Sequence, residues 1–338
     1  MKGALSAELP EVFAPSAPRL SPELPHEAFA PRAPEPSPAS RPSRTPAPHG
    51  AAGAPSRPRA ASGPGTLRAG TIIDKFRIEE LLGVGGFAAV YRATHLLLHT
   101  TVALKLLRAD VVARRPNLAV QLLQEARFAA RIEHRNVVRV FDVTHTPAIT
   151  YIVMEFIRGP SLARLIEDRG PLPVATLARI GIDTIDGLAA GLSQGLIHRD
   201  IKPPNILLGD DGVARIVDLG LANPIFDRDE GPLRDSAVIG TRGYMSPEQI
   251  ADPRAVDFRS DIYSLGITLR EAATGEPPPE SPRHDDRLAA AMPPSLAPIV
   301  GWMVAPDPDD RPGSYRELRD ALSELADTPA PHDRITDQ

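Results

Sequence analysis

Residues 198–205 read His-Arg-Asp-Ile-Lys-Pro-Pro-Asn and place three different chemical groups close together. Asp200 offers a carboxylate, Lys202 an ammonium group and Asn205 an amide. The two prolines favour a stiff loop over a helix, and the apolar run 206–208 predicts a short buried strand behind the loop. A base, a cation and a metal-binding oxygen on one rigid support suit the transfer of a highly charged group. An isolated His-Arg-Asp would more simply be a charged surface turn, but the added lysine and asparagine favour chemistry.

This string resembles the catalytic loop of protein kinases, and Lys202, two residues after Asp200, resembles their Ser/Thr-specific branch. The resemblance implies that Asp200 orients an acceptor hydroxyl and takes its proton, while Lys202 steadies the moving phosphate. It also implies that Asn205 binds a metal ion and that Arg199 pairs with a phosphate on the activation segment. His198 resembles the family's structural histidine and is not expected to act as a base.

A glycine-rich segment lies between two predicted strands, where backbone amides can approach phosphate oxygens because glycine has no Cβ. Residues 83–90 read Gly-Val-Gly-Gly-Phe-Ala-Ala-Val. They resemble the kinase Gly-rich loop, with Ala88 at the third glycine position, so we expect slower nucleotide exchange or weaker ATP affinity. An ordinary hairpin turn would explain the segment alone equally well. The resemblance implies that ATP contacts Leu82, Gly83, Val84, Gly85, Gly86, Val90, Ala103, Lys105, Met154, Glu155, Ile157 and Leu207.

The apolar strand predicted at 101–107 carries one lysine, Lys105, and a buried ammonium group needs an anionic partner. A helix predicted over 117–132 places Glu125 beside its apolar stripe. By resemblance, Lys105 grips the α- and β-phosphates of ATP while Glu125 orients it. The alternatives are an edge-strand lysine and a helix-face acid, both directed to solvent.

Two further strands are predicted at 137–143 and 149–155, around a turn at Pro147. The second strand leads into a segment that resembles the hinge between the two kinase lobes, with Met154 as the gatekeeper. A helix predicted over 173–194 then delivers the chain to the catalytic loop. Its expected buried face carries Leu177, Ile180, Thr184, Leu188 and Leu192.

Asp218 opens an Asp-Leu-Gly triplet that follows a strand predicted at 213–217. The triplet alone would be a turn, but its position after Asn205 and a strand resembles the metal-binding Asp-Phe-Gly of kinases. Asp218 and Asn205 would therefore ligate Mg²⁺, with Mn²⁺ as an alternative ion, on the phosphates of ATP.

Residues 221–248 resemble the activation segment. Thr241 is expected to hydrogen-bond the catalytic loop and shape the substrate groove. Ser236 is the only other hydroxyl residue between Leu221 and Thr241, and we interpret it as an autophosphorylation switch. An unmodified polar loop residue is the alternative.

Two charged residues are expected to be structural. Asp261, in a helix predicted over 258–274, would hold the backbone of the catalytic loop. Arg311 would pair with Glu248, and breaking such a buried pair typically costs about 3–5 kcal/mol. A final helix is predicted over 315–326.

Composition excludes several classes of function. The 338 residues contain no cysteine, which excludes disulfides, cysteine-ligated zinc and a thiol nucleophile. A net charge of −5 gives no indication of nucleic-acid binding. No apolar run of about 20 residues predicts a membrane span, and no secretion signal is recognisable. These features predict a cytoplasmic protein.

The chain divides into three predicted regions. Residues 1–68 hold more than a third of the 38 prolines, and we expect this Pro/Ala/Arg-rich tail to be disordered. Residues 69–327 are predicted to be an α+β protein kinase domain, with a β-rich N-lobe at about 69–155 and a helical C-lobe at about 159–327. Residues 328–338 form a short C-terminal tail.

Together the motifs resemble the bacterial eukaryotic-type Ser/Thr kinases, which transfer the γ-phosphoryl group of ATP to Ser or Thr hydroxyls of protein substrates. A homodimer would permit trans-autophosphorylation. A nucleotide-binding pseudokinase is the alternative, favoured by Ala88 and by the altered region 276–286, but Lys105, Asp200 and Asp218 are all present. A small-molecule phosphotransferase is a second alternative, against which Lys202 and the Ser-Pro-Glu at 246–248 argue.

Overall fold

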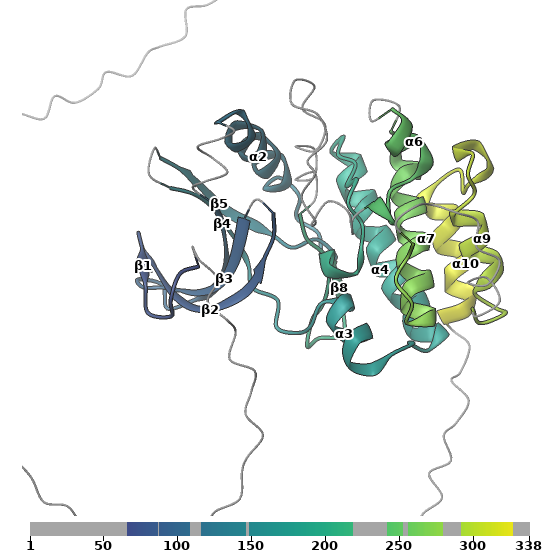
Figure 1. The fold of residues 1–338 in the computed structure, drawn as a ribbon, viewed down its shortest axis with the longest axis horizontal. Helices are drawn as coiled ribbons and strands as arrows, with labels where there is room; N and C mark the ends of the chain where they lie inside the picture. Colours follow the sequence, from purple (N-terminus) through teal and green to yellow (C-terminus); the bar gives the residue numbers. More distant parts are fainter. Residues whose placement is uncertain are drawn as a thin grey trace, which may run out of the picture. The chain divides into compact units, whose positions relative to one another are not determined.

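The computed structural model describes residues 66–86, 88–108, 116–146, 149–218, 242–252, 256–279 and 292–326 (Figure 1). All of them belong to one compact unit, 60–338. Residues 1–65 of the expected tail lie outside the described residues. Ser236 and Thr241 also lie outside them. The boundaries of the three predicted regions remain predictions.

The first part of the described chain is an antiparallel sheet with strand order β1-β2-β3-β4-β6-β5. Its fourth strand occupies the predicted residues, and the register pairs Lys105 with Val90 on one side and Ile152 on the other. The strands are β1 (Ile72–Ile73), β2 (Phe76–Val84), β3 (Ala88–His95), β4 (Thr101–Leu107), β5 (Val140–His145) and β6 (Thr150–Glu155).

Strand β4 contributes to apolar clusters on both faces of the sheet, because successive side chains of a strand point to opposite sides. In β4, Val102 and Leu104 pack into one apolar cluster, whereas Ala103 and Leu107 pack into another. The second cluster includes Ala126 and Ala129 of helix α2 (Pro116–Ala129), which lies beside the sheet in Figure 1.

Two boundaries predicted in this part are wrong by three residues, and the start of α2, the end of β5 and the start of β6 differ by one or two. Helix α2 ends at Ala129 rather than at residue 132. Strand β5 begins at Val140 rather than at 137, because the preceding residues bond elsewhere. Val138 donates to Ile216 O, and Ile216 donates to Asn136 O, both at 2.9 Å.

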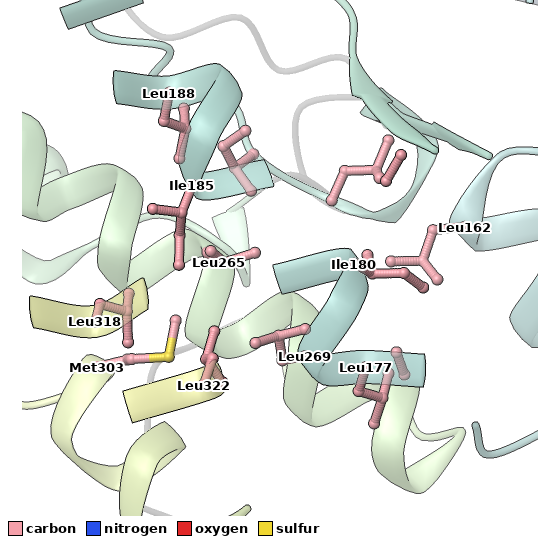
Figure 2. Packing of buried hydrophobic residues seen from close by; sticks show 14 of the residues in the cluster. Leu162, Leu177, Ile180, Ile185, Leu188, Leu265, Leu269, Met303, Leu318 and Leu322 are labelled. Carbon is pink, nitrogen blue, oxygen red and sulfur yellow. The ribbon is translucent and has the colours of Figure 1, made fainter. Parts of the chain in front are cut away.

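The second part is mostly helical and is built around α4 (Val174–Ser193). Figure 2 shows leucine and isoleucine side chains of α4 packed against residues of α7 (Phe258–Thr274), α9 (Ala297–Met303) and α10 (Tyr315–Ala326). The bounds of α7 and α10 are the predicted ones. The remaining elements are α3 (Leu162–Arg169), η1 (Pro203–Asn205), β7 (Ile206–Leu208), β8 (Ala214–Ile216), α6 (Pro247–Ala251) and η3 (Pro308–Asp310).

The predicted buried face of α4 is correct except at its end. Leu177, Ile180, Thr184 and Leu188 are buried, but Leu192 is 37% exposed. The buried stripe continues from Leu188 to Gly191, an i+3 step, so that Leu192 falls at the edge of the stripe.

Candidate active site

The loop 198–205, which the sequence predicts to be catalytic, is anchored by Asp261 of α7, which is fully buried. Its carboxylate accepts hydrogen bonds from the backbone N–H groups of His198 at 2.8 Å and Arg199 at 2.7 Å. Burial raises the pKa of Asp261, while the two N–H donors and His198 favour its charged form. The contact expected between Asp261 and the catalytic-loop backbone is therefore present.

His198 connects the loop to the strand that precedes Asp218. Its ring is buried, and Nε2 lies 2.8 Å from Val217 O. Val217 in turn donates its backbone N–H to Asn205 O at 3.0 Å. These bonds bring the Asp218 region against the loop, and they use His198 as a structural residue.

Two predicted catalytic residues, Asp200 and Lys202, and the predicted metal ligand Asn205 meet at the Asp200 carboxylate. Lys202 Nζ lies 2.8 Å from Asp200 Oδ2, and Asn205 Nδ2 donates to the same oxygen at 3.0 Å. Asn205 Nδ2 also donates to Asp200 O at 2.8 Å, which leaves the amide oxygen of Asn205 for another partner. The prolines do not keep the whole loop irregular, because Pro203–Asn205 form one 3₁₀ turn, η1. Proline is tolerated at the start of such a turn, where its missing N–H has no helical partner.

Lys105 of β4 lies opposite Asp218, with Nζ 2.7 Å from Oδ1. Their side chains are 13% and 27% exposed, so both groups are largely shielded from water. Asp218 has a φ of +61°, in the left-handed region that is uncommon for residues other than glycine. Glu125 lies in α2, but its side chain is outside the described part of the chain. The expected Lys105–Glu125 pair therefore remains a prediction.

Five of the residues expected to contact ATP lie in one apolar cluster, here called the hinge cluster. Ala103, Met154 and Ile157 are buried within it, and Val90 and Leu207 pack against it while remaining partly exposed. They come from β3, β4, β6, the segment after β6, and β7. The fold thus gathers side chains that are more than 100 positions apart in the sequence.

The glycine-rich segment forms the end of β2 and the turn into β3. Gly85 donates its N–H to Ala88 O at 2.8 Å, and Val84 pairs with Ala89. Leu82 and Val84 are exposed, as are Gly83 and Gly86, so their surfaces are free to meet a ligand. Ala88 is the first residue of β3 and is buried.

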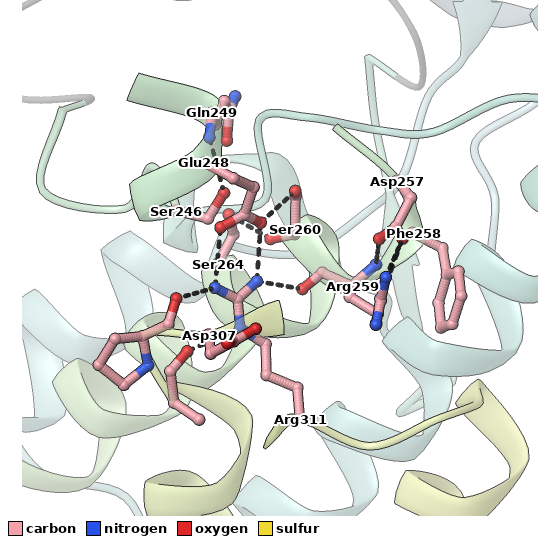
Figure 3. A network of polar contacts seen from close by, with 12 residues as sticks. Ser246, Glu248, Gln249, Asp257, Phe258, Arg259, Ser260, Ser264, Asp307 and Arg311 are labelled. Atoms are coloured by element: carbon pink, nitrogen blue, oxygen red, sulfur yellow. Dashed lines mark hydrogen bonds and ion pairs between the residues drawn. The ribbon is translucent and has the colours of Figure 1, made fainter. Parts of the chain in front are cut away.

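A polar network joins α6 to the later helices (Figure 3). Both nitrogens of the Arg311 fork donate to Glu248, Nη1 to Oε1 at 2.7 Å and Nη2 to Oε2 at 2.8 Å. Burial alone would raise the pKa of Glu248, but the bonds from Arg311 and from the Ser260 and Ser246 hydroxyls lower it to about 2. The Glu248–Arg311 ion pair predicted from the sequence is present.

Sequence reasoning missed two contacts near this network. Gln249 donates its side-chain Nε2 to Arg199 O at 2.8 Å. Tyr244 donates its hydroxyl to Glu271 Oε2 at 2.5 Å, and burial raises the pKa of both groups. Neither contact follows a spacing rule, so the sequence could not predict them. The one signal in the sequence is that Gln249 directly follows the Ser-Pro-Glu at 246–248.

In the described residues, no group of three or more His, Asp or Glu side chains is placed to hold a metal ion. His95, one of two histidines four residues apart, instead accepts hydrogen bonds at Nδ1 from the N–H groups of Leu97 and Leu98. No helix in the described part of the chain has the length and apolar character needed to cross a membrane.

Comparison with known proteins gives one consistent result. The model of the family described as "Protein kinase domain" matches residues 76–327. The chain is 36% identical over 276 residues to Serine/threonine-protein kinase PknB of Mycolicibacterium smegmatis, covering 76% of this chain and 44% of the relative. It is 36% identical over 264 residues to PknB of Mycobacterium tuberculosis, covering 73% and 42%. The chain thus spans less than half the length of these curated relatives.

The solved structure of the Mycobacterium tuberculosis PknI kinase domain is also similar. Its TM-score is 0.63 at 27% sequence identity, and the match covers 77% of this chain and 100% of that one.

Proposed function

We propose that this chain, which belongs to the protein kinase family, is a Ser/Thr protein kinase of the bacterial eukaryotic type. The α+β kinase fold predicted from the sequence is confirmed by the family match and by the PknI kinase domain. The observation that carries the proposal is the convergence on Asp200 of Lys202 and Asn205, next to the ion-paired Lys105 and Asp218. The reaction is transfer of the γ-phosphoryl group of ATP to a Ser or Thr hydroxyl of a protein.

Asp200 orients the acceptor hydroxyl and takes its proton. Its carboxylate is held by two donors on one oxygen, Oδ2, so that Oδ1 can accept the hydrogen bond from the substrate. Lys202, 2.8 Å from the same carboxylate, is positioned to offset negative charge on the transferred phosphoryl group. Positioning and charge neutralisation supply most of the acceleration in such a reaction.

The donor set fits a hard divalent cation. Asp218 provides a carboxylate, and Asn205 keeps its amide oxygen because its nitrogen donates to Asp200. Mg²⁺, or Mn²⁺ in its place, would supply neutralisation of the phosphate charge when bound. Lys105, which pairs with Asp218, would hold the α- and β-phosphates, and Glu125 would orient it.

The hinge cluster supports a site for the adenine ring. Its partly exposed members, Val90 of β3 and Leu207 of β7, come from before and after the hinge segment in the sequence. An apolar surface of this kind favours the flat faces of a base, while the backbones of Glu155 and Ile157 provide polar contacts to its edge. Leu82, Val84 and the glycines at 83, 85 and 86 would cover the phosphates.

Regulation by autophosphorylation is part of the proposal. Arg199 Nε is buried and has no hydrogen-bond partner among the described residues, which supports pairing with a phosphate. Ser236 is the proposed acceptor, Thr241 would shape the substrate groove, and a homodimer would allow transfer in trans. Phosphopeptide mapping of active protein would detect phosphate on Ser236, and an unchanged rate for Ser236→Ala would argue against the switch. A cytoplasmic location remains a prediction.

The decisive experiment follows label transfer from ATP to the chain itself and to a generic protein acceptor such as dephosphorylated casein, with Mg²⁺ present. The native chain is expected to label both, and Asp200→Asn to lose at least about 10²-fold in rate while still binding ATP. Asp210→Asn, an exposed acid in the turn between β7 and β8, is the matched control and should keep the native rate.

The alternatives predict different results. Bound ATP without transfer by the native chain would indicate a pseudokinase. Transfer only to small molecules would indicate another phosphotransferase. An Asp200→Asn variant with the native rate would refute the assigned base.

A further inference from the structure

Gln249 is a buried polar residue whose side chain reaches from α6 to the catalytic loop. It is 3% exposed. Its backbone N–H donates to the hydroxyl of Ser246, the N-cap of α6, at 3.3 Å, and Figure 3 shows the two side by side. Its side-chain Nε2 donates to Arg199 O at 2.8 Å. One residue therefore connects the end of the activation segment to the residue before Asp200.

The bonded carbonyl belongs to an unusual residue. Arg199 has a φ of +65°, a left-handed conformation that a residue with a Cβ adopts only when its surroundings hold it there. Asp261 of α7 accepts the N–H of Arg199 at 2.7 Å, and Gln249 of α6 binds its carbonyl. The backbone on both sides of the strained residue is thus fixed, from two different helices.

The carbonyl of Arg199 lies in the same planar peptide unit as the N–H of Asp200. Because that unit is rigid, a bond that sets the direction of the carbonyl also sets the backbone from which the Asp200 side chain departs. Among the described residues, the N–H of Asp200 makes one hydrogen bond, which is long, 3.3 Å to His198 Nδ1. The bond from Gln249 is therefore the shorter of the two that orient this peptide.

The amide of Gln249 is not explained by packing. Its Oε1 is buried and has no hydrogen-bond partner among the described residues, which is unfavourable. An apolar side chain of the same length would fill the space without that cost. The N–H donor is the part of the side chain that has a partner.

We propose that Gln249 is a positioning residue for the transfer reaction, which acts through the Arg199–Asp200 peptide and links α6 to the catalytic base. The inference rests on the proposed kinase function. Glu248, the neighbour of Gln249, binds Arg311 and so anchors the short helix α6. Gln249 itself bonds to the catalytic loop, so that the position of α6 affects the position of the loop.

The test uses the full chain carrying Gln249→Met, which keeps the length of the side chain and removes its donor. We expect kcat for casein phosphorylation to fall about tenfold, the equivalent of one hydrogen bond, with KM for ATP within about twofold of native. Hydrogen exchange of the peptide 198–202 should become faster. Gln249→Glu, which also lacks the donor when ionised, should lower kcat similarly.

Thr184→Val is the matched control, because it removes a buried hydroxyl that bonds only within α4, to Ile180 O at 2.7 Å. It should leave kcat and the exchange of 198–202 unchanged. A native kcat for Gln249→Met would overturn the inference, and so would a loss that Thr184→Val reproduces at an equal drop in Tm. If the native chain transfers no phosphate, the proposed function fails, and exchange at 198–202 alone then decides whether Gln249 fixes the loop.

Discussion

Replacing Arg311 with methionine would leave Glu248 as a shielded carboxylate without its counterion. Arg311 is 3% exposed, and its guanidinium group makes two bonds of 2.7 and 2.8 Å to Glu248. It also donates to the backbone carbonyls of Arg259, Ala305 and Pro306. Methionine would fill much of the volume but satisfy none of these acceptors.

The magnitude follows from the pKa of Glu248. Burial acts to raise it, yet the bonds from Arg311 and Ser260 lower it from 4.5 to about 2. At about 1.4 kcal/mol per unit, this shift corresponds to roughly 3 kcal/mol of stability at neutral pH. Removing one partner of a buried ion pair typically costs about 3–5 kcal/mol, which agrees.

The sign of the pH dependence is fixed by the same shift. Because the folded pKa lies below the unfolded one, the stabilisation is complete above about pH 4.5 and is lost as the pH falls toward 2. The difference in unfolding free energy between native protein and Glu248→Gln should therefore shrink across that window and stay constant above it.

Urea unfolding followed by circular dichroism at pH 7 measures the effect. Arg311→Met should lose about 3 kcal/mol, and Arg316→Met, which removes an exposed arginine 3.9 Å from Asp320, should lose less than about 0.5 kcal/mol. The double variant Glu248→Gln/Arg311→Met should recover part of the loss, since no uncompensated charge remains. Equal midpoints for Arg311→Met and Arg316→Met would refute the reasoning.

Two further predictions concern packing and the phosphate site. Gly187→Ala should destabilise the fold by about 1–3 kcal/mol in thermal melts, because the new Cβ would lie 2.7 Å from Asn136 O and 3.2 Å from Ile216. Gly301→Ala is the control, because its Cβ would meet open space in α9, and it should be neutral or stabilising in the same melts. Lys105→Met removes the cation paired with Asp218. It should therefore abolish the rise in Tm that ATP and Mg²⁺ give the native chain, and it should lower the rate of phosphate transfer about 10²-fold. A native rise in Tm with ATP in that variant would exclude Lys105 from the phosphate site.

Local patterns were sufficient for the long elements. The apolar run at 101–107 and the segments 258–274 and 315–326 predict the bounds of β4, α7 and α10 correctly. In α10 the buried residues Tyr315, Leu318 and Leu322 recur at helical spacing. The short helices α3, α6 and α9 were missed, because five to eight residues carry too few turns for a period to emerge. Their starts depend on caps such as Ser246, whose hydroxyl accepts the N–H of Gln249.

The start of β5 shows how tertiary contacts override a local pattern. Val137 and Val138 continue the apolar run into β5, and the sequence therefore predicts one strand from 137. In the fold these residues bond to β8, almost 80 positions later, and the ladder with β6 begins only at Val140. Hydrogen-bond partners that distant leave no trace in a local window.

By itself, the sequence determined which groups are available for chemistry: a carboxylate, an ammonium and an amide in one stiff loop, a lysine within an apolar strand, and an aspartate after a short one. Residue type and near spacing decide that much, because they fix charge, donors and backbone freedom locally. Only the tertiary structure decided that Lys105 meets Asp218 and that Gln249 binds the carbonyl before Asp200, and it confirmed that Asp261 accepts the N–H groups of the loop. Each of these contacts joins segments 50 or more residues apart, and their pairing depends on how helices and sheet pack around a shared core.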